Sequence, residues 1–255
     1  MGTPLKDWNI QINYGIKTGF NDAFIIDGTK RNELIEKDPK SAEIIRPLLR
    51  GRDIKRYAYE FADLYLIATF PSLKINIEEY QAVKAHLTSF GVNRLQQTGE
   101  NGTRKKTNNK WFETQDSIAY WEDFFRPKII YPEITKFLNF CYDESDFLAN
   151  NKCFILTGEK IYFLIAFFNS SLFKYCFRDD FPELLGGSRE LRKVFLEKIP
   201  VLKVDNDVNL RLKYLVEKMQ SNASRSVEIE IDNILFELYN LNTDERKEIG
   251  FIEIQ

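Results

Sequence analysis

The order of apolar and polar residues predicts strands in the first two thirds of the chain. Residues 8–16 and 22–27 either run apolar or alternate between apolar and polar positions, which is typical of strands. Between them, Gly15, Gly19 and Asn21 tolerate a left-handed backbone, so we expect the two segments to pair as a hairpin. Further strands are predicted at residues 64–70, 127–131, 136–141 and 153–157.

Helices are predicted between and after these strands. Asp38 is a typical N-cap residue and Pro39 suits the first helical position, so we expect a helix to begin there. Its buried face would be formed by Ala42, Ile45, Leu48 and Leu49. We also expect a helix over residues 77–90, capped by Asn76, and a more apolar helix over residues 159–177.

The C-terminal part of the chain contains no strand pattern. Apolar residues at positions 210–216 indicate one helix, and residues 229–239 indicate a second. Asn242, with Glu245 three residues later, is typical of a capping box at the start of a last helical turn. This part of the chain is therefore expected to be helical.

The composition permits a sizeable core but no common zinc site. Hydrophobic residues make up 44% of the 255 residues and aromatic residues 14%, and core packing is a more frequent role for aromatic rings than base stacking. Three cysteines without a CxxC spacing and a single histidine do not suit a Cys/His zinc site. Reduced cysteines, no leader pattern and no apolar run of membrane-spanning length indicate a cytoplasmic protein with no membrane partner.

Charge is distributed unevenly along the chain. The net charge is −2, but residues 205–255 contain six Lys/Arg and eleven Asp/Glu, which leaves 30 against 27 in residues 1–204. Residues 84–110 hold six basic residues and one acidic residue. Because local fields steer DNA more than the net charge does, this distribution permits nucleic-acid binding.

The least patterned stretch is residues 96–110, which contain two glycines, three asparagines, four cations and no apolar residue. Two interpretations stay open. The stretch is either a solvated loop or a loop whose amide and cationic side chains contact base edges in a DNA groove.

Signatures of catalysis are missing from the sequence. There is no Pro-Pro pair, so the Asn/Asp-Pro-Pro-Tyr/Phe motif of adenine methyltransferases is absent, and neither a dinucleotide-binding glycine signature nor a phosphate-binding lysine loop occurs. Asp179, Asp180 and Glu183 are carboxylates without a suitable lysine, which leaves a degenerate metal-dependent nuclease as an alternative. We otherwise expect no catalytic residue, metal or cofactor in this chain.

Two segments carry a family resemblance, GIKTGFNDAFIID at residues 15–27 and IIRPLLRGRDI at residues 44–54. Matching segments follow in order at residues 64–67, 86–94, 110–113, 126–134, 164–173, 196–201 and 231–241. The chain thereby resembles the TaqI-like specificity domain, the target-recognition module of type II restriction-modification enzymes whose methyltransferase acts on adenine. Phe168 and Phe236 stand where that family usually has Leu and Tyr.

The resemblance implies a mixed α/β, α+β-like fold in which a mixed, curved β-sheet is flanked by helices. Residues 1–204 would form the target-recognition domain, and residues 205–255 a helical C-terminal segment packed on it. The domain would bind duplex DNA and position a fused or separate adenine-specific methyltransferase, possibly with a nuclease, so that it flips its target base. S-adenosylmethionine and magnesium are expected only on those catalytic parts. Because family members usually carry them before this domain, the chain looks like an excised module or a split subunit.

Two sets of DNA contacts are expected from this resemblance and from the local chemistry. Base contacts would come from the unpatterned loop and from the turn near residue 20; the candidates are Thr18, Asn21, Arg94, Thr103, Arg104, Lys105, Lys106, Asn108 and Lys110. Phosphate contacts would come from cations and from exposed backbone N–H groups of glycines; the candidates are Lys17, Arg50, Gly51, Arg52, Lys128, Gly186, Gly187, Ser188 and Arg189. The competing hypothesis is a protein-interaction module whose basic residues only keep its surface soluble.

Overall fold

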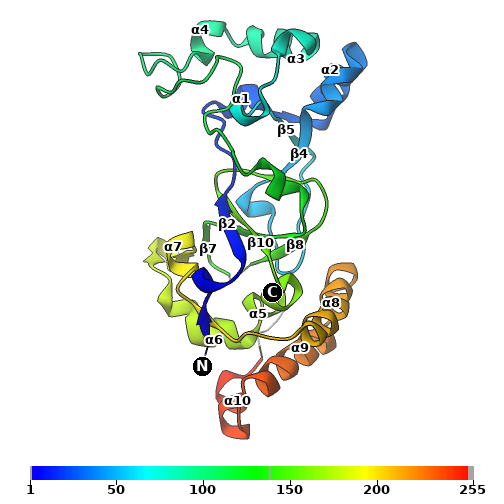
Figure 1. Ribbon diagram of the computed structural model, residues 1–255, viewed down its shortest axis with the longest axis vertical. Coiled ribbons are helices and arrows are strands. Elements are labelled where there is room, and N and C mark those ends of the chain that lie inside the picture. Colours follow the sequence, from blue (N-terminus) through cyan, green and yellow to red (C-terminus); the bar gives the residue numbers. More distant parts are fainter. Residues whose placement is uncertain (1, 138, 252–255) are drawn as a thin grey trace.

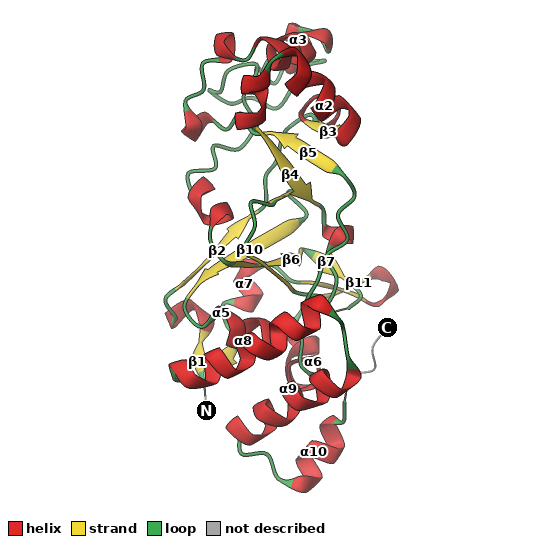
Figure 2. Ribbon diagram, turned by 90° about the vertical axis from the view of Figure 1, so that its right-hand side faces the viewer, coloured by secondary structure: helices red, strands yellow, loops and turns green. Residues whose placement is uncertain are grey.

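The structure is a computed structural model that describes residues 2–137 and 139–251. The molecule is elongated, with β-sheets in its middle and helices at both ends (Figures 1 and 2). The mixed α/β class predicted from the sequence is confirmed, and the sheets do not close into barrels. Among the described residues, none of the helices combines the length and the apolar character needed to cross a membrane.

An antiparallel sheet crosses the middle of the molecule in the order β2-β10-β6-β8. Its strands are β2 (Ile10–Tyr14), β10 (Cys153–Gly158), β6 (Lys128–Pro132) and β8 (Cys141–Asp143). Successive side chains of a strand point to opposite faces, so Ile129 and Tyr131 enter one hydrophobic core and Ile130 enters the other. Because this sheet is buried on both faces, the apolar residues of β6 and β10 are consecutive at residues 129–132 and 153–156.

One face of the central sheet supports a lobe built around a second sheet, in the order β3-β5-β4-β9. Its strands are β3 (Ile25–Asp27), β5 (Leu64–Ile67), β4 (Ile45–Leu49) and β9 (Leu148–Ala149). This sheet is mixed, because β4 pairs antiparallel with β5 and parallel with β9. The helices of this lobe lie at the top of Figure 1: α1 (Asn21–Phe24), α2 (Gly28–Lys37), α3 (Gln81–Ser89) and α4 (Val92–Leu95).

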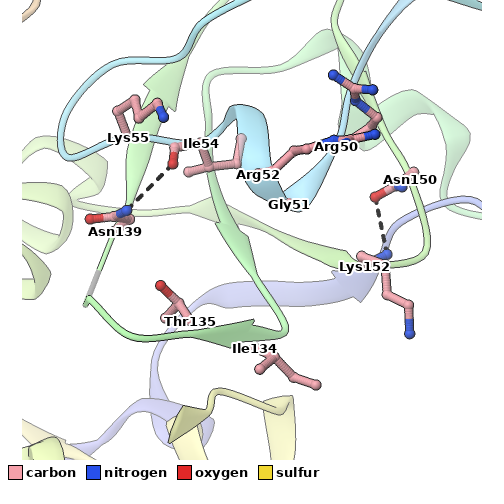
Figure 3. A pocket seen from close by; sticks show the side chains of 10 residues that line it. All are labelled: Arg50, Gly51, Arg52, Ile54, Lys55, Ile134, Thr135, Asn139, Asn150 and Lys152. Atoms are coloured by element: carbon pink, nitrogen blue, oxygen red, sulfur yellow. Dashed lines mark hydrogen bonds between the residues drawn. The ribbon is translucent and has the colours of Figure 1, made fainter. Parts of the chain in front are cut away.

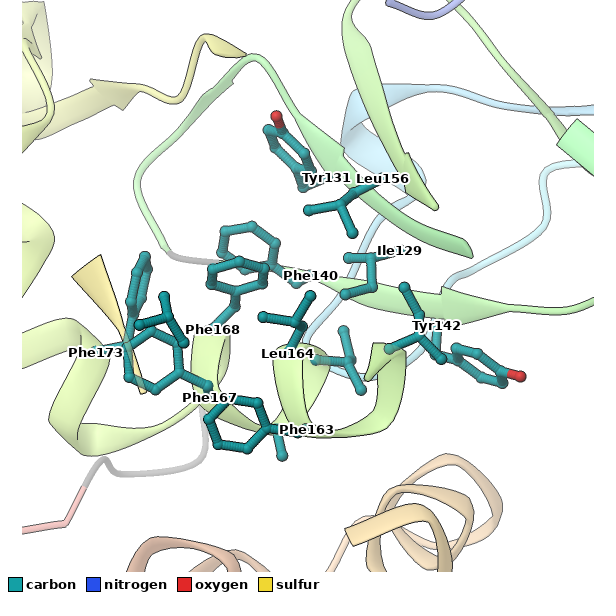
Figure 4. Packing of buried hydrophobic residues seen from close by; sticks show 14 of the residues in the cluster. Ile129, Tyr131, Phe140, Tyr142, Leu156, Phe163, Leu164, Phe167, Phe168 and Phe173 are labelled. Carbon is teal, nitrogen blue, oxygen red and sulfur yellow. The ribbon is translucent and has the colours of Figure 1, made fainter. Parts of the chain in front are cut away.

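Helices cover the opposite face of the central sheet. They are α5 (Ile161–Phe168), α6 (Ser171–Phe177), α8 (Asn206–Ser221), α9 (Arg225–Leu238) and α10 (Thr243–Ile249). Leu164 and Phe168 of α5 lie toward the sheet, and the ring centroids of Phe140 and Phe168 are 4.8 Å apart (Figure 4). Leu212 and Leu215 of α8 join the same core, so the helical C-terminal segment packs on the rest of the chain. The division into two domains at residue 204 stays a prediction.

Smaller elements complete the fold. A three-stranded antiparallel sheet has the order β11-β12-β7, with β11 (Glu183–Leu184), β12 (Ser188–Glu190) and β7 (Ile134–Thr135). β1 (Thr3–Pro4) pairs with β13 (Pro200–Val201), and α7 (Lys193–Leu196) lies between β12 and β13 in the chain.

The predicted cap residues are confirmed. The side chain of Asp38 accepts a hydrogen bond from the backbone N–H of Lys40, with Pro39 in the first position of a short 3-10 helix. The side chain of Asn76 likewise accepts from the N–H of Glu78. Asn242 and Glu245 form the expected reciprocal capping box at the start of α10.

The predicted hairpin of residues 8–16 and 22–27 is wrong. β2 and β3 belong to different sheets, and α1 lies between them in the chain. Gly19 does adopt a left-handed backbone, with φ 80°. Gly15 has another role, since a Cβ built on it would lie 1.9 Å from the carbonyl oxygen of Asn150. The glycine therefore lets two backbones approach closely instead of forming a turn.

The predicted helix from Pro39 to Leu49 is also wrong. Only Pro39–Glu43 is helical, as a 3-10 turn, and Ile45–Leu49 is strand β4. Pro47 accounts for the difference, because proline breaks a helix interior and disfavours helical dihedrals at the residue before it.

The other predicted helices are present but interrupted. Residues 77–90 form a 3-10 turn (Ile77–Glu79) followed by α3, and residues 159–177 are divided into α5 and α6. At the second break, the side chain of Ser170 accepts a hydrogen bond from the N–H of Phe173 and starts α6. The predicted strand at residues 136–141 is wrong except for Cys141, which begins β8; residue 138 lies outside the described residues.

Candidate functional site

A polar cavity of about 490 Å³ lies beside the basic turn at Arg50-Gly51-Arg52. The turn continues into a 3-10 helix, Gly51–Asp53, which forms one side of the cavity, and β7 forms the facing side (Figure 3). We call this cavity the basic cleft; its lining residues are Arg50, Gly51, Arg52, Ile54, Lys55, Ile134, Thr135, Asn139, Asn150 and Lys152.

Arg50 is held in place by a buried carboxylate. Asp53 accepts hydrogen bonds from the backbone N–H of Arg50 at 2.8 Å and from its Nε at 2.9 Å, and a second guanidinium nitrogen lies 2.8 Å from the other carboxylate oxygen. These bonds to Asp53 raise the pKa of the Arg50 guanidinium above its ordinary value. Because this bidentate pair offsets the charge of Arg50, the net positive charge of the basic cleft comes mainly from its other cations.

Those other cations are Arg52, Lys55 and Lys152. Arg52 is exposed and forms no ion pair within residues 2–137 and 139–251. Lys55 lies 3.3 Å from Glu60, and Lys152 lies 3.8 Å from Glu133, both in partly exposed pairs. Exposed pairs of this kind are weak, so both lysines can exchange their carboxylates for another anion at little cost.

The loop at residues 96–110 is ordered by polar contacts although it has no apolar residue. Arg104 is only 2% exposed, and its guanidinium donates to the carbonyl oxygens of Leu95, Thr18 and Trp111 at 2.8, 2.9 and 2.7 Å. Burial lowers the pKa of Arg104 to about 10. Gln97 is also buried and donates to two further carbonyl oxygens. The stretch is therefore a loop that is exposed over most of its length and anchored by two buried polar side chains.

Three predicted base contacts are engaged within the protein. Arg104 is buried and bound to three carbonyls, so it does not present its guanidinium to a base. Thr18 is also buried, and its hydroxyl donates to the side-chain oxygen of Asn21 at 2.7 Å. Thr103 is half-buried, and its hydroxyl donates to the carbonyl oxygen of Glu100 at 2.8 Å. Their burial was not predictable from the sequence, because none of these residues lies in an apolar pattern.

The remaining candidates of the loop and of the neighbouring turn are exposed, and two contacts join the segments that carry them. Arg104 joins the two segments through its bond to Thr18, and the guanidinium of Arg94 lies 4.3 Å from the ring centroid of Phe20. We call this the loop surface; its exposed members are Lys17, Asn21, Arg94, Lys105, Lys106, Asn108 and Lys110. The structure therefore brings together two segments that are about eighty residues apart in the chain.

The loop surface adjoins the basic cleft through residues 16–18. Asn150, which lines the cleft, forms a parallel β-bridge with Ile16. Lys17 follows, and the carbonyl oxygen of Thr18 accepts from both Arg104 and the backbone N–H of Gln115. The backbone of residues 16–18 therefore connects the cleft lining to the loop, and Lys17 is the exposed cation on this connection.

Lys128 was predicted to contact phosphate, and this prediction is wrong for the structure described. Its side chain is 0% exposed, and its Nζ lies 2.5 Å from a carboxylate oxygen of Asp143 and donates to the carbonyl of Ser145 at 2.7 Å. Burial raises the pKa of Asp143 above its ordinary value. Lys128 is therefore part of a buried ion pair at the end of the central sheet.

The predicted glycine loop is the tip of the hairpin formed by β11 and β12. Gly186 and Gly187 have φ of 78° and 76°, and no atom lies within 4 Å of a Cβ built on either. Ser188 pairs with Leu184 in the hairpin. The backbone of this tip is therefore accessible, as the prediction requires.

Arg189, in contrast, is engaged inside the protein. Its guanidinium lies 2.9 Å from Asp179 and 3.1 Å from Glu183, and it donates to the carbonyl oxygen of Phe181. Arg189 thus stabilises the hairpin instead of facing solvent. The same bonds engage two carboxylates of the alternative nuclease site, and within the described residues no group of three or more His, Cys, Asp or Glu side chains is placed to hold a metal ion.

Comparison with known proteins gives consistent results. The family model of the TaqI-like C-terminal specificity domain matches residues 46–201. The Type II methyltransferase M.MjaIV of Methanocaldococcus jannaschii is 21% identical to this chain over 251 residues, which cover 91% of this chain and 80% of that protein.

Two solved structures share the fold. The type IIL restriction-modification enzyme MmeI, solved in complex with DNA, has a TM-score of 0.63 and 10% identity, and the match covers 97% of this chain and 36% of MmeI. The type IIG restriction endonuclease BpuSI has a TM-score of 0.56 and 14% identity, and the match covers 92% of this chain and 31% of BpuSI. The chain thus spans about a third of the length of these two proteins.

Proposed function

The chain belongs to the family of TaqI-like C-terminal specificity domains of type II restriction-modification enzymes, and from this membership we propose that it recognises a target sequence in duplex DNA. The observation that carries the proposal is that the basic cleft and the loop surface both expose cations and that residues 16–18 connect the two. A duplex needs such an extended array, because phosphate contacts along its backbone supply most of the non-specific affinity.

The two surfaces differ in chemistry, and we assign a different DNA contact to each. The basic cleft combines Arg52, Lys55 and Lys152 with the accessible backbone of the turn at Gly51, which suits phosphate oxygens. The loop surface combines cations with the amide of Asn108, and these groups match the donors and acceptors of base edges in the major groove. The cleft would fix the position of the domain on DNA, and the loop surface would contribute sequence preference.

Similarity to MmeI supports the DNA partner. The structure of that enzyme contains DNA. Part of the enzyme has a fold similar to that of this chain, and the match covers 97% of this chain. We place methyl transfer to adenine, and any strand cleavage, on a fused or separate partner, because the Asn/Asp-Pro-Pro-Tyr/Phe motif is missing from this sequence. S-adenosylmethionine and magnesium would bind to that partner in the cytoplasm.

A direct test is duplex binding by the 255-residue chain, measured by fluorescence anisotropy over a range of salt concentrations. If about four to six phosphates are contacted, the slope of log affinity against log salt should lie near −4 to −5. Lys247→Ala, on α10 and away from both surfaces, should leave the slope unchanged. A parental slope near zero would instead favour the protein-interaction hypothesis.

A parallel assay tests the placement of catalysis. One relative that this chain matches over most of its length is itself called a methyltransferase. The chain alone, supplied with S-adenosylmethionine and the same duplex, should incorporate no methyl group. Methylation by the purified chain would overturn the assignment to a separate catalytic part.

A further inference from the structure

Leu185 is the most exposed large apolar side chain named in the structure, at 102% of its reference area. It stands at the tip of the β11–β12 hairpin, directly before Gly186 and Gly187. Both glycines have positive φ and no protein atom within 4 Å of a built Cβ, so the tip projects away from the rest of the molecule. The sequence analysis considered only the glycines here and missed this leucine.

The base of the hairpin is held firmly. β12 pairs with β7 on one side and with β11 on the other, and the N–H of Leu191 donates to the carbonyl of Glu133 at 2.7 Å. Arg189, at the centre of this sheet, binds Asp179 and Glu183. The leucine is therefore unshielded at the tip of a hairpin whose base is anchored in a three-stranded sheet.

The hairpin shares its sheet with one side of the basic cleft. β7 supplies Ile134 and Thr135 to the cleft lining, facing the turn that carries Arg52 (Figure 3). Figure 2 shows β7 and β11 close together at one edge of the molecule. Ile134 is itself 47% exposed. The hairpin is therefore continuous with one wall of the basic cleft, whose other lining residues include cations that attract phosphate, and this favours DNA over an apolar protein surface as the occupant of the tip.

We propose that Leu185 is a wedge that inserts into a base step of the duplex held at the basic cleft. Proteins that kink DNA insert Leu, Ile, Phe, Met or Pro side chains between bases, and partly unstack them. A stiff hairpin with a leucine at its tip has the required shape and chemistry. The inference rests on the proposed DNA-binding function and adds a deformation of the bound duplex to it.

The test compares two labelled duplexes of the same sequence, one intact and one with a single abasic site. Insertion into the intact duplex carries the cost of unstacking, which the missing base reduces, so the parental chain should bind the abasic duplex about tenfold more tightly. Leu185→Ala should remove most of this preference, and Leu185→Phe should keep it. Val194→Ala, which shortens another exposed apolar side chain on α7, should behave like the parent. Because Leu185 is fully exposed, both of its variants should fold normally.

The outcomes separate this inference from the function on which it rests. If the parent binds neither duplex, the proposed DNA recognition fails. If the parent binds both duplexes equally, with the salt dependence expected for phosphate contacts, the wedge is overturned while DNA recognition stands. If Leu185→Ala keeps the full preference for the abasic duplex, the wedge is likewise overturned.

Discussion

Arg104 is a cation in a segment without apolar residues, and the fold buries it. Its guanidinium supplies the hydrogen-bond donors for three carbonyls and joins the loop to the turn at Thr18. Sequence alone cannot distinguish this arginine from its exposed neighbours Lys105 and Lys106, because the carbonyls that it binds come from distant parts of the chain. Charge alone gives these cations the same expected role, and burial gives Arg104 a structural one.

Replacing Arg104 by Met should lower the stability of the chain. The change leaves buried carbonyl oxygens without donors, which costs about 3 kcal/mol in the free energy of unfolding. Urea denaturation followed by circular dichroism measures this cost. The neighbouring Lys105→Ala should change the same quantity by less than about 0.5 kcal/mol. If the Arg104→Met variant were as stable as the parent, the hydrogen bonds of Arg104 would not contribute to the stability of the chain.

Arg50 is paired with Asp53 and Arg52 has no ion pair among the described residues. We therefore expect one variant to lose stability and the other to lose DNA affinity. Arg52→Ala should leave thermal stability unchanged and reduce the salt slope of duplex binding by about one unit, because one phosphate contact is lost. Arg50→Ala should instead lower the free energy of unfolding by about 1–3 kcal/mol, since it leaves the buried carboxylate of Asp53 without its bidentate partner. Thermal melts of both variants measure the stability loss, and salt titrations of duplex binding measure the change in slope. A stability loss for Arg52→Ala with an unchanged slope would reverse the two roles.

At the scale of elements, local signals were predictable from the sequence and strand pairing was not. The caps at Asp38, Asn76 and Asn242 depend on residues within one turn, and all three are present. The parallel pairing of β4 with β9, in contrast, joins residues about a hundred positions apart. Pro47 was a usable signal against a helix over β4, whereas the apolar pattern of that segment fits a strand and a helix equally well.

Gly15 illustrates a contact that only the folded chain shows. Gly15→Ala places a Cβ against the backbone of Asn150 and should cost about 1–3 kcal/mol of stability through overpacking, or more if the strands separate. Gly102→Ala is a matched control, because Gly102 has φ 81° but open space around its Cβ. It should cost about 1 kcal/mol, from the left-handed backbone alone. A larger loss for Gly102→Ala than for Gly15→Ala, measured by thermal denaturation, would contradict the close approach.

At the scale of the whole molecule, two cores share one central sheet, and the candidate DNA surfaces lie on the lobe of one core and at its junction with the sheet. The C-terminal helices, which carry the excess of acidic residues, pack on the opposite face of the sheet. This separation explains why the net charge of −2 is a poor guide to DNA binding by this chain. The uneven distribution of charge along the chain is visible in the sequence. Only the fold shows that the acidic C-terminal helices and the candidate DNA surfaces lie on opposite faces of the central sheet.

The central claim is that this chain itself recognises a DNA sequence. Selection from a random duplex library, with sequencing of the bound fraction, tests it most directly. We expect the parental chain and the Lys247→Ala control to enrich one motif, and the combined change of Lys105, Lys106 and Asn108 to alanine to weaken or alter that motif while the chain stays folded. Binding without any enrichment over the starting library would contradict the claim and leave only a non-specific attraction to phosphate.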